Sequence, residues 1–293
     1  MMPVNLRTFD RVASGPSDSS VSPFTLAPPL PLRHLLSLTG LLAVLTGSAA
    51  QAQTSSSPND DPSYRKEFVY GLNFNTRGGL IGGISVRSTR VLNETWSRYW
   101  SIEAVEVKHR KERRLGSYNG SSFILNKSNY FFALRPSVGV QRSVFRKAAE
   151  SGVQVNALAS AGPSIGLLMP YYIYYDYTQR DPTTNRPIGS EDIRTEQFDP
   201  NIHPDPARYV VDRAPLFTGA NEIKPLIGAH LRAALSFEYG RYRDAVAGIE
   251  TGVLLELYGQ RPVILRSLNV PDSDINNRFY PSVYLTIYLG SRS

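Results

Sequence analysis

Cysteine is absent from the 293-residue chain, and so are long apolar runs. The absence of disulfides argues against a small cross-linked extracellular domain and favours a larger fold closed by backbone hydrogen bonds. The most apolar run, residues 35–45, is too short for a transmembrane helix, which needs roughly 20 apolar residues. The rest of the chain is therefore either soluble and exported or built from membrane strands.

Histidine is also scarce, with four residues in the whole chain. The sequence contains no metal-ligand spacing, no phosphate-binding loop and no dinucleotide fingerprint. We therefore expect no cofactor and no bound metal. Calcium held by Asp199 and Asp205 is the weaker alternative, because their spacing matches no EF-hand.

The N-terminus carries the pattern of an export signal. Residues 35–45 follow Arg33 and His34, and the segment GSAAQAQ after them contains Ala50 and Ala52 in an A-x-A cleavage pattern. We expect a secretory signal peptide, with a helical anchor as the alternative. The predicted organisation is a signal peptide at 1–52, a flexible lead-in at 53–65 and one folded domain at 66–293.

The formal net charge is +7. A basic balance can indicate nucleic acid, but an exported chain meets anionic lipid more often. No nucleic-acid partner is therefore expected.

Apolar and polar residues alternate with a period of two through much of the domain. In PLIGAHLRAALSFEYG, residues 225–240, apolar odd positions oppose a face that contains His230, Arg232 and Glu238. A helix, at about 100° per residue, would scatter these polar residues around its axis. The polar face of a soluble sandwich would be richer in Lys and Thr, so the pattern favours the inside of a membrane barrel. The predicted strands are 67–75, 79–91, 98–110, 129–142, 151–178, 225–239, 244–259 and 279–290.

The connections alternate between short and long. The predicted turns are 92–97, 143–150 and 240–243, and the predicted long loops are 111–128, 179–224 and 260–278. Outer-membrane barrels have short periplasmic turns, long extracellular loops and an even number of strands. The first outer connection, near Arg77, is a short exception. The predicted fold class is an all-β transmembrane antiparallel up-and-down β-barrel of eight strands with long extracellular loops.

One predicted strand, 151–178, is too long for this scheme. It would measure roughly 90 Å if fully extended, and Gly162 and Pro163 interrupt it. We favour a strand that projects beyond the membrane with a bulge at Pro163. The alternative is a turn at this point and a count of nine strands.

The run NYFFALRPSVGVQRSVFRKAAESGVQVNALASAGPSIGLLMPYYI at 129–173, with GGLIGGISVR before it, resembles a family of uncharacterised outer-membrane β-barrel proteins of Bacteroidota. The resemblance implies a barrel at 66–293 in the outer membrane of a Gram-negative bacterium. It implies no reaction and no functional residue. With the export signal, it predicts Sec-type export, insertion by the barrel-assembly machinery and contact with outer-membrane lipid.

Charged residues on the inward face predict a plugged lumen. Side chains just fill the interior of a small barrel, so inward charges must neutralise one another. If 240–243 is a hairpin turn, Arg232 lies opposite Glu250 or one diagonal step away. A polar ligand site and a narrow pore are the alternatives to this salt-bridged plug. The predicted lumen network is Arg135, His230, Arg232, Glu238, Glu250 and Glu256.

Two further segments predict contacts at the outer surface. YYIYYDY predicts an outer aromatic belt at headgroup level, formed by Tyr171, Tyr172, Tyr174 and Tyr175. KHRKERR predicts contact with anions such as lipopolysaccharide phosphates, through Lys108, Arg110, Lys111, Arg113 and Arg114. The loop 179–224 is long enough to predict surface recognition.

No catalytic residue is expected. Glu250 and Glu256 lie roughly 20 Å apart along a strand, too far for a glycosidase pair, and His230 has no identifiable serine partner in the sequence. The predicted function is a non-enzymatic outer-membrane barrel that acts through its loops, or as an envelope assembly or secretion component, on an envelope or extracellular partner. The alternatives are a lipid or peptide hydrolase using His230 and a soluble exported barrel that binds an apolar ligand.

Overall fold

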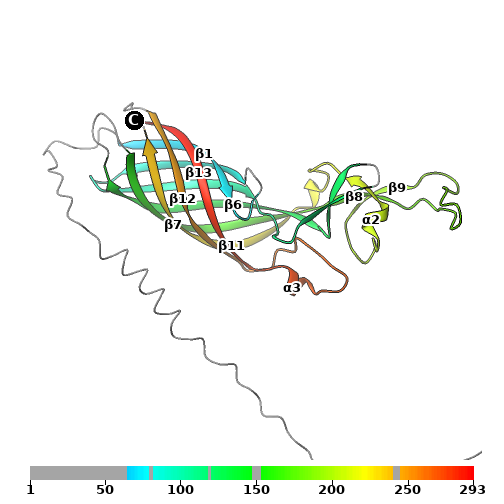
Figure 1. Cartoon of the computed structure of the whole chain (residues 1–293). Helices are drawn as coiled ribbons and strands as arrows, with labels where there is room; N and C mark the ends of the chain where they lie inside the picture. The colour runs from blue at the N-terminus through cyan, green and yellow to red at the C-terminus, as the bar shows by residue number, and fades with distance from the viewer. Residues whose placement is uncertain (1–64, 79–81, 118–119, 147–152, 240–244) are drawn as a thin grey trace, which may run out of the picture. The chain divides into compact units, whose positions relative to one another are not determined.

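The computed structural model describes residues 65–78, 82–117, 120–146, 153–239 and 245–293 (Figure 1). The predicted signal peptide and nearly all of the predicted lead-in lie outside these residues. No helix in the described ranges is long and apolar enough to cross a membrane.

Within the described ranges, eight strands close into an antiparallel barrel. Strands that follow one another along the barrel part of the chain are neighbours in space, and the first pairs with the last to close the ring (Figure 1). The predicted fold class and strand count are therefore confirmed. The barrel strands are β1 (Lys66–Asn75), β2 (Gly83–Val91), β3 (Trp96–Glu106), β6 (Asn129–Phe145), β7 (Val153–Pro170), β11 (Lys224–Tyr239), β12 (Ala245–Tyr258) and β13 (Phe279–Arg292).

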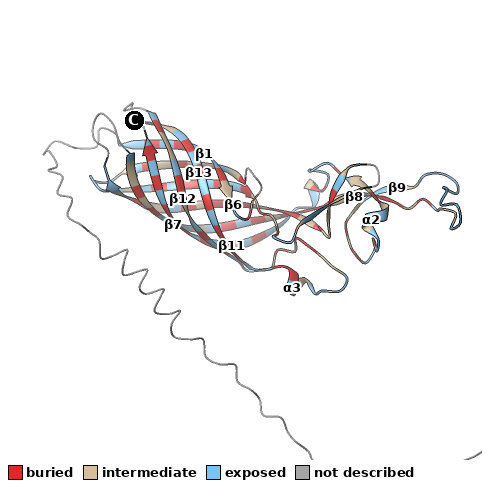
Figure 2. Cartoon of the chain, viewed as in Figure 1, coloured by how far each residue is buried: buried red, intermediate tan, exposed pale blue. Residues whose placement is uncertain are grey.

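Side chains alternate between the two faces of the barrel wall. On β11, Ile227 is 77% exposed and Leu231 is 60% exposed, whereas His230 is 2% exposed. The same alternation gives β12 and β13 their banded appearance in Figure 2. The apolar residues face outward and the polar residues face the lumen, which is the reverse of a water-soluble fold and typical of a barrel surrounded by lipid.

β7 is continuous through Gly162 and Pro163. Pro163 lies opposite Ala229 on β11, and the pairing of β7 with β6 keeps one register before and after this point. The expected bulge at Pro163 is therefore wrong, and so is the alternative of a turn. In this register Pro136 on β6 faces Pro163. Since neither proline has an N–H to donate, hydrogen bonding is lost at one place in the ladder without a change of register.

The long connections pack together at one end of the barrel, and we call their described residues (within 107–128, 171–223 and 259–278) the loop module. The Tyr171 N–H donates to the Ser128 carbonyl at 2.9 Å, and the Ser128 N–H donates to the Ile264 carbonyl at 2.9 Å, so the first connection is hydrogen-bonded to both of the others. The module contains a sheet of β8 (Tyr172–Asp176), β9 (Ile193–Gln197) and β10 (Val210–Arg213), a hairpin of β4 (Arg113–Gly116) and β5 (Ser122–Leu125), and the short helices α2 (Pro206–Tyr209), η1 (Ala220–Glu222) and α3 (Asp272–Ile275).

The loop module has a hydrophobic core of its own. The predicted strand 151–178 divides here, because β7 ends at Pro170 and β8 joins the separate sheet. The core under that sheet is formed by Phe123, Tyr130, Met169, Tyr171, Ile173, Tyr175, Phe198 and Val210. The long connections of the barrel are therefore a packed structure rather than a set of independent loops.

Candidate functional site

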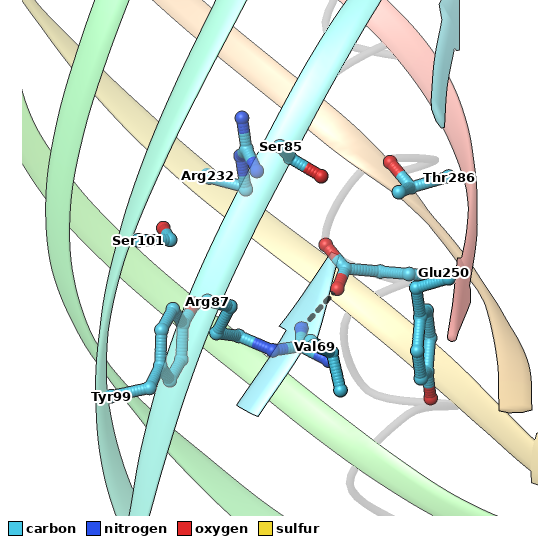
Figure 3. A pocket seen from close by; sticks show the side chains of 9 residues that line it. Val69, Ser85, Arg87, Tyr99, Ser101, Arg232, Glu250 and Thr286 are labelled. Carbon is cyan, nitrogen blue, oxygen red and sulfur yellow. Dashed lines mark hydrogen bonds and ion pairs between the residues drawn. The ribbon is translucent and has the colours of Figure 1, made fainter. Parts of the chain in front are cut away.

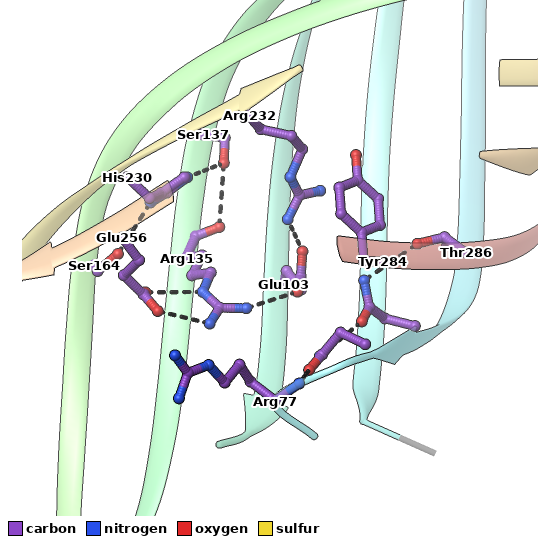
Figure 4. Close-up of polar contacts among 12 residues, drawn as sticks. Arg77, Glu103, Arg135, Ser137, Ser164, His230, Arg232, Glu256, Tyr284 and Thr286 are labelled. Carbon is purple, nitrogen blue, oxygen red and sulfur yellow. Dashed lines mark hydrogen bonds and ion pairs between the residues drawn. The ribbon is translucent and has the colours of Figure 1, made fainter. Parts of the chain in front are cut away.

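Arg135 is the centre of the lumen charge network nearer the loop module (Figure 4). It donates to Glu256 from Nε at 2.9 Å and from Nη2 at 2.8 Å. Its Nη1 donates to Glu103 at 2.9 Å, and Glu103 also forms an ion pair with Arg232. Arg135, Glu103 and Glu256 are each no more than 3% exposed. Charges buried this far from water are tolerated only when each has a partner.

A second group of ion pairs lies nearer the short turns. Arg87 pairs with Glu250, whose other oxygen accepts a hydrogen bond from the Tyr284 hydroxyl at 2.6 Å. Arg292 bridges Glu67 at 2.8 Å and Glu238 at 2.5 Å. Ion pairs therefore cross the lumen at several levels and connect strands that are far apart in the sequence.

The structure places all six residues of the predicted lumen network on the inward face, but one expected pairing is wrong. Arg232 lies opposite Leu254, and Glu250 lies opposite Ser236, because the β11–β12 register pairs Tyr239 with Ala247. Relative to the predicted hairpin, every cross-strand pair is therefore shifted along β12. Arg232 finds its carboxylate partner across the lumen on β3 instead.

Four members of the network were not predicted from the sequence, and they lie on β1, β2, β3 and β13. Along β3, Glu103 shares its parity with the small Ser101 and opposes the apolar Trp100 and Ile102, both exposed. This alternation is the sequence signal that could have placed Glu103 in the lumen. The missed residues are Glu67, Arg87, Glu103 and Arg292.

His230 has serine partners that the sequence did not reveal. Its Nε2 lies 2.8 Å from the Ser137 hydroxyl and its Nδ1 lies 3.1 Å from the Ser164 hydroxyl. These three residues are 5% exposed or less. A nucleophilic serine needs a substrate beside it as well as a base, and here the serines are sealed in packed lumen, so the arrangement is that of a satisfied buried histidine.

The lumen leaves very little free volume. A cavity of about 20 Å³ lies between Arg87, Arg232 and Glu250 (Figure 3). That volume suits about one water molecule, and its lining combines charged, hydroxyl and aromatic side chains. It therefore has no room for the apolar ligand of the soluble-barrel alternative.

The predicted aromatic belt is wrong for two of its tyrosines. Tyr171 is fully buried and Tyr175 is 5% exposed, because both pack into the core of the loop module. The Tyr171 hydroxyl also accepts a hydrogen bond from the Ile124 N–H at 3.0 Å. Tyr172 and Tyr174 are half-buried on the other face of β8. None of the four lies on a barrel strand, since β7 ends before them.

The predicted anion-contact run lies in the loop module, around β4. Lys108 forms an ion pair with Glu106 at 3.5 Å. Within the run, His109 is buried and contacts the Ile275 carbonyl at 2.9 Å, which anchors this segment to α3. The remaining four cations of the prediction, Arg110, Lys111, Arg113 and Arg114, are exposed, so they stay available for the predicted contact with anions.

A groove of about 860 Å³ opens on the loop module between β8, α2 and the segment that follows β8. The Asp176 carboxylate at its edge accepts hydrogen bonds from the Thr178 N–H at 2.9 Å and from Arg180 at 2.8 Å. Burial and a hydrogen bond to Glu196 raise the pKa of Tyr177 to about 12, so its hydroxyl stays a donor. The groove presents aromatic rings and charges of both signs, from Tyr175, Asp176, Tyr177, Arg180, Arg208 and Tyr209.

In the described part of the chain, no group of three or more His, Asp or Glu side chains is placed to hold a metal ion. Asp199, which was the alternative calcium ligand, instead accepts hydrogen bonds from the backbone and side chain of Asn201 at 2.9 Å. The Asp199 carboxylate therefore stabilises the turn that precedes the buried His203.

No protein-family model and no curated protein matches the sequence. Among solved structures, the attachment invasion locus protein Ail of Yersinia pestis has a TM-score of 0.33 and 9% identity, covering 78% of this chain and 99% of that chain. Ail with the heparin analogue sucrose octasulfate gives 0.32 and 9%, with 78% and 99% covered. Neisserial surface protein A gives 0.33 and 8%, with 78% and 97% covered. At such TM-scores the fold assignment rests on the strand pairing itself, and membership of the Bacteroidota family stays a prediction.

Proposed function

We propose that the protein is a non-enzymatic outer-membrane β-barrel that binds an external partner through its loop module. The outward apolar surface supports the membrane location, because exposed Ile227, Leu231 and Val253 on a closed barrel would be unfavourable in water. The short turns then face the periplasm and the loop module faces the outside.

The ion pairs that fill the lumen support a function without transport through the barrel and without catalysis inside it. Ion pairs span it at several levels, and the cavity beside Arg87 holds about 20 Å³. An ion or solute would have to break the pairs around Arg135 to pass, and a buried pair is costly to break.

The observation that carries the proposal is the groove on a loop module with its own core. A preformed site loses little conformational entropy on binding, which favours affinity. Tyrosine and arginine, which line this groove, are the residue types enriched where proteins bind other molecules. In the alternative form of the proposal, as an envelope assembly or secretion component, the partner would be another envelope protein.

The absence of cysteine makes the membrane topology directly testable. A single cysteine at the exposed loop position, Thr183→Cys, is expected to react with a membrane-impermeant maleimide on intact Gram-negative cells. The matched variant at an exposed short turn, Glu94→Cys, is expected to react only after the outer membrane is permeabilised. Labelling of Glu94→Cys on intact cells, or recovery of the protein in the soluble fraction, would contradict the proposal.

Binding by the groove is tested with the detergent-extracted protein on arrays of surface oligosaccharides and peptides. We expect Arg208→Ala, which removes a groove cation, to abolish the binding that wild type shows. Arg186→Ala removes an exposed cation from the same loop outside the groove and is expected to bind normally. Wild-type binding that survives Arg208→Ala together with Tyr177→Ala would place recognition elsewhere.

A further inference from the structure

Three basic residues form a row across the outer wall of the barrel. Lys66 on β1 lies opposite Arg90 on β2, and Arg90 lies opposite Arg98 on β3. All three are exposed and share the outward parity of their strands. Directly opposite residues have Cβ atoms about 5 Å apart, so three cations stand side by side at the short-turn end.

This basic row lacks the neutralising partners that the lumen charges have. No carboxylate in the described residues lies within ion-pair distance of Lys66, Arg90 or Arg98. Like charges directly opposite each other destabilise a sheet. The arrangement therefore favours an anion that is not part of the described protein.

Among the described residues, the outward cations at this end lie on one side of the barrel. At the same end, the outward positions on β13, β11 and β7 are Ser291, Tyr239 and Val153. A belt that served only to hold the barrel at the membrane surface would be expected on all strands. Arg142 on β6 is a further exposed outward cation beside the row, and a cluster on these four neighbouring strands is instead the pattern of a local binding site.

The surroundings of the row suit a molecule with an anionic head and an apolar tail. Trp96 and Trp100 flank Arg98 along β3, and Arg142 from β6 lies over the Trp96 ring at 5.5 Å from its centroid. A groove of about 600 Å³ joins the basic row to Trp100 and Val138, which continue toward the apolar middle of the wall. Tryptophan rings are favoured at the level where headgroups meet the hydrocarbon.

We propose that the basic row is a binding site for an acidic glycerophospholipid, with its phosphate on Arg90 and Arg98 and an acyl chain along Trp100 and Val138. Lysine and arginine near a membrane surface attract anionic lipid, and arginine binds phosphate through two parallel hydrogen bonds. The site rests on the proposed function, which places the short-turn end at the periplasmic leaflet. Glycerophospholipid is the occupant we assign because lipopolysaccharide phosphates belong to the opposite side of the membrane.

The chain itself carries the probe for this site, because Trp96 and Trp100 are its two tryptophans. The full protein is reconstituted into phosphatidylcholine vesicles that contain a small fraction of bromine-labelled phosphatidylglycerol, or the same fraction of bromine-labelled phosphatidylcholine. Bromine quenches tryptophan fluorescence only at short range, so quenching reports which lipid stands at the basic row. We expect the labelled phosphatidylglycerol to quench more strongly in wild type.

Removing the cations is expected to remove this preference. Each cation near the surface enriches an anionic lipid by about 5-fold, so Arg90→Gln with Arg98→Gln should bring the two labelled lipids close to equal quenching. The control, Arg186→Gln with Arg278→Gln, removes the same charge from exposed positions in the loop module and should keep the wild-type preference.

The outcomes separate this inference from the proposed function. Equal quenching by both labelled lipids in wild type would overturn the lipid site and leave the membrane barrel intact. Quenching by neither would show that the wall does not face lipid, which would overturn both. Relief of quenching by unlabelled lipid A, and not by unlabelled phosphatidylglycerol, would overturn the assignment to a glycerophospholipid.

Discussion

At the scale of single residues, the molecule depends on charges that are buried in pairs. Arg135 holds two carboxylates, Glu103 and Glu256, and Glu103 has Arg232 as a second partner. Such a network contributes little when intact, because desolvation offsets the attraction between its members. Removal of one member is destabilising, because its former partner stays buried without a compensating charge.

Replacing Arg135 with methionine should therefore destabilise the barrel by about 3–5 kcal/mol. Glu256 would lose its ion-pair partner while remaining 1% exposed. Urea unfolding of vesicle-inserted protein measures the loss. The double variant Arg135→Met with Glu256→Met should recover most of it, because Glu103 keeps Arg232. A loss for the single variant of under about 1 kcal/mol, typical of a surface pair, would contradict the buried network.

The serines around His230 are expected to matter for stability and not for catalysis. Ser137→Ala leaves the imidazole Nε2 without its hydroxyl partner, at a cost of about 1–3 kcal/mol. The same urea titration measures it, with the outward Ser88→Ala as the matched control. A lipid or peptide hydrolysis by wild type that disappears in Ser137→Ala, without loss of stability, would revive the hydrolase alternative.

At the scale of strands, the alternation of apolar and polar residues predicted which residues face the lumen. The spacing of charges did not predict which charges pair. Alternation requires only local sequence, so the inward faces of β11, β12 and β13 could be read directly. Register depends on how two strands align, and β11 and β12 align with Tyr239 opposite Ala247, which is shifted from the alignment that the expected turn would give. The partner of Arg232 could not be predicted for this reason.

The loop module could not be predicted because its order comes from distant contacts. The alternation of YYIYYDY is real, with Tyr171, Ile173 and Tyr175 on one face. The sequence cannot show that Phe123, Phe198 and Val210 pack with this face in place of lipid. A buried tyrosine and an interfacial tyrosine have the same local pattern.

The end of β8 gives the loop module a dependence on pH. Burial opposes ionisation of Asp176, but hydrogen bonds from Thr178 and Arg180 outweigh it and lower its pKa below the usual carboxyl range. A lowered pKa stabilises the folded state above the ordinary carboxyl pKa, and this contribution is lost as pH falls through the lowered value. Proteolysis of the module should therefore accelerate in acid, and Asp176→Asn should make it faster at neutral pH with a weaker dependence on pH.

The matched control for this prediction is Asp212→Asn, on β10 of the same sheet. It is expected to keep the wild-type change of proteolysis rate with pH. If Asp176→Asn also kept that change, the pH dependence of the module would have to come from another group.

At the scale of the whole molecule, the closed wall has a mainly apolar outer surface and a mainly polar lumen face. The lumen is sealed by its own side chains, so interactions with other molecules are left to the outer wall and the loop module. In the proposed function, the outer wall meets lipid, with a local site at the basic row, and the loop module meets the exterior. Binding to other molecules is therefore expected at the outer wall and the loop module and not in the lumen.

An arginine in the outer wall tests the membrane environment of the whole barrel. Val253 on β12 is 48% exposed and lies between Ala233 and Val283 on the neighbouring strands. In a bilayer, Val253→Arg should cost about 2–4 kcal/mol, because an arginine near the midplane must leave water. Urea unfolding from vesicles measures this cost. Leu268→Arg, at an exposed apolar position in the loop module, should cost almost nothing. Equal stability of the two variants would mean that Val253 faces water, and the barrel would then be a soluble protein with an exposed apolar surface.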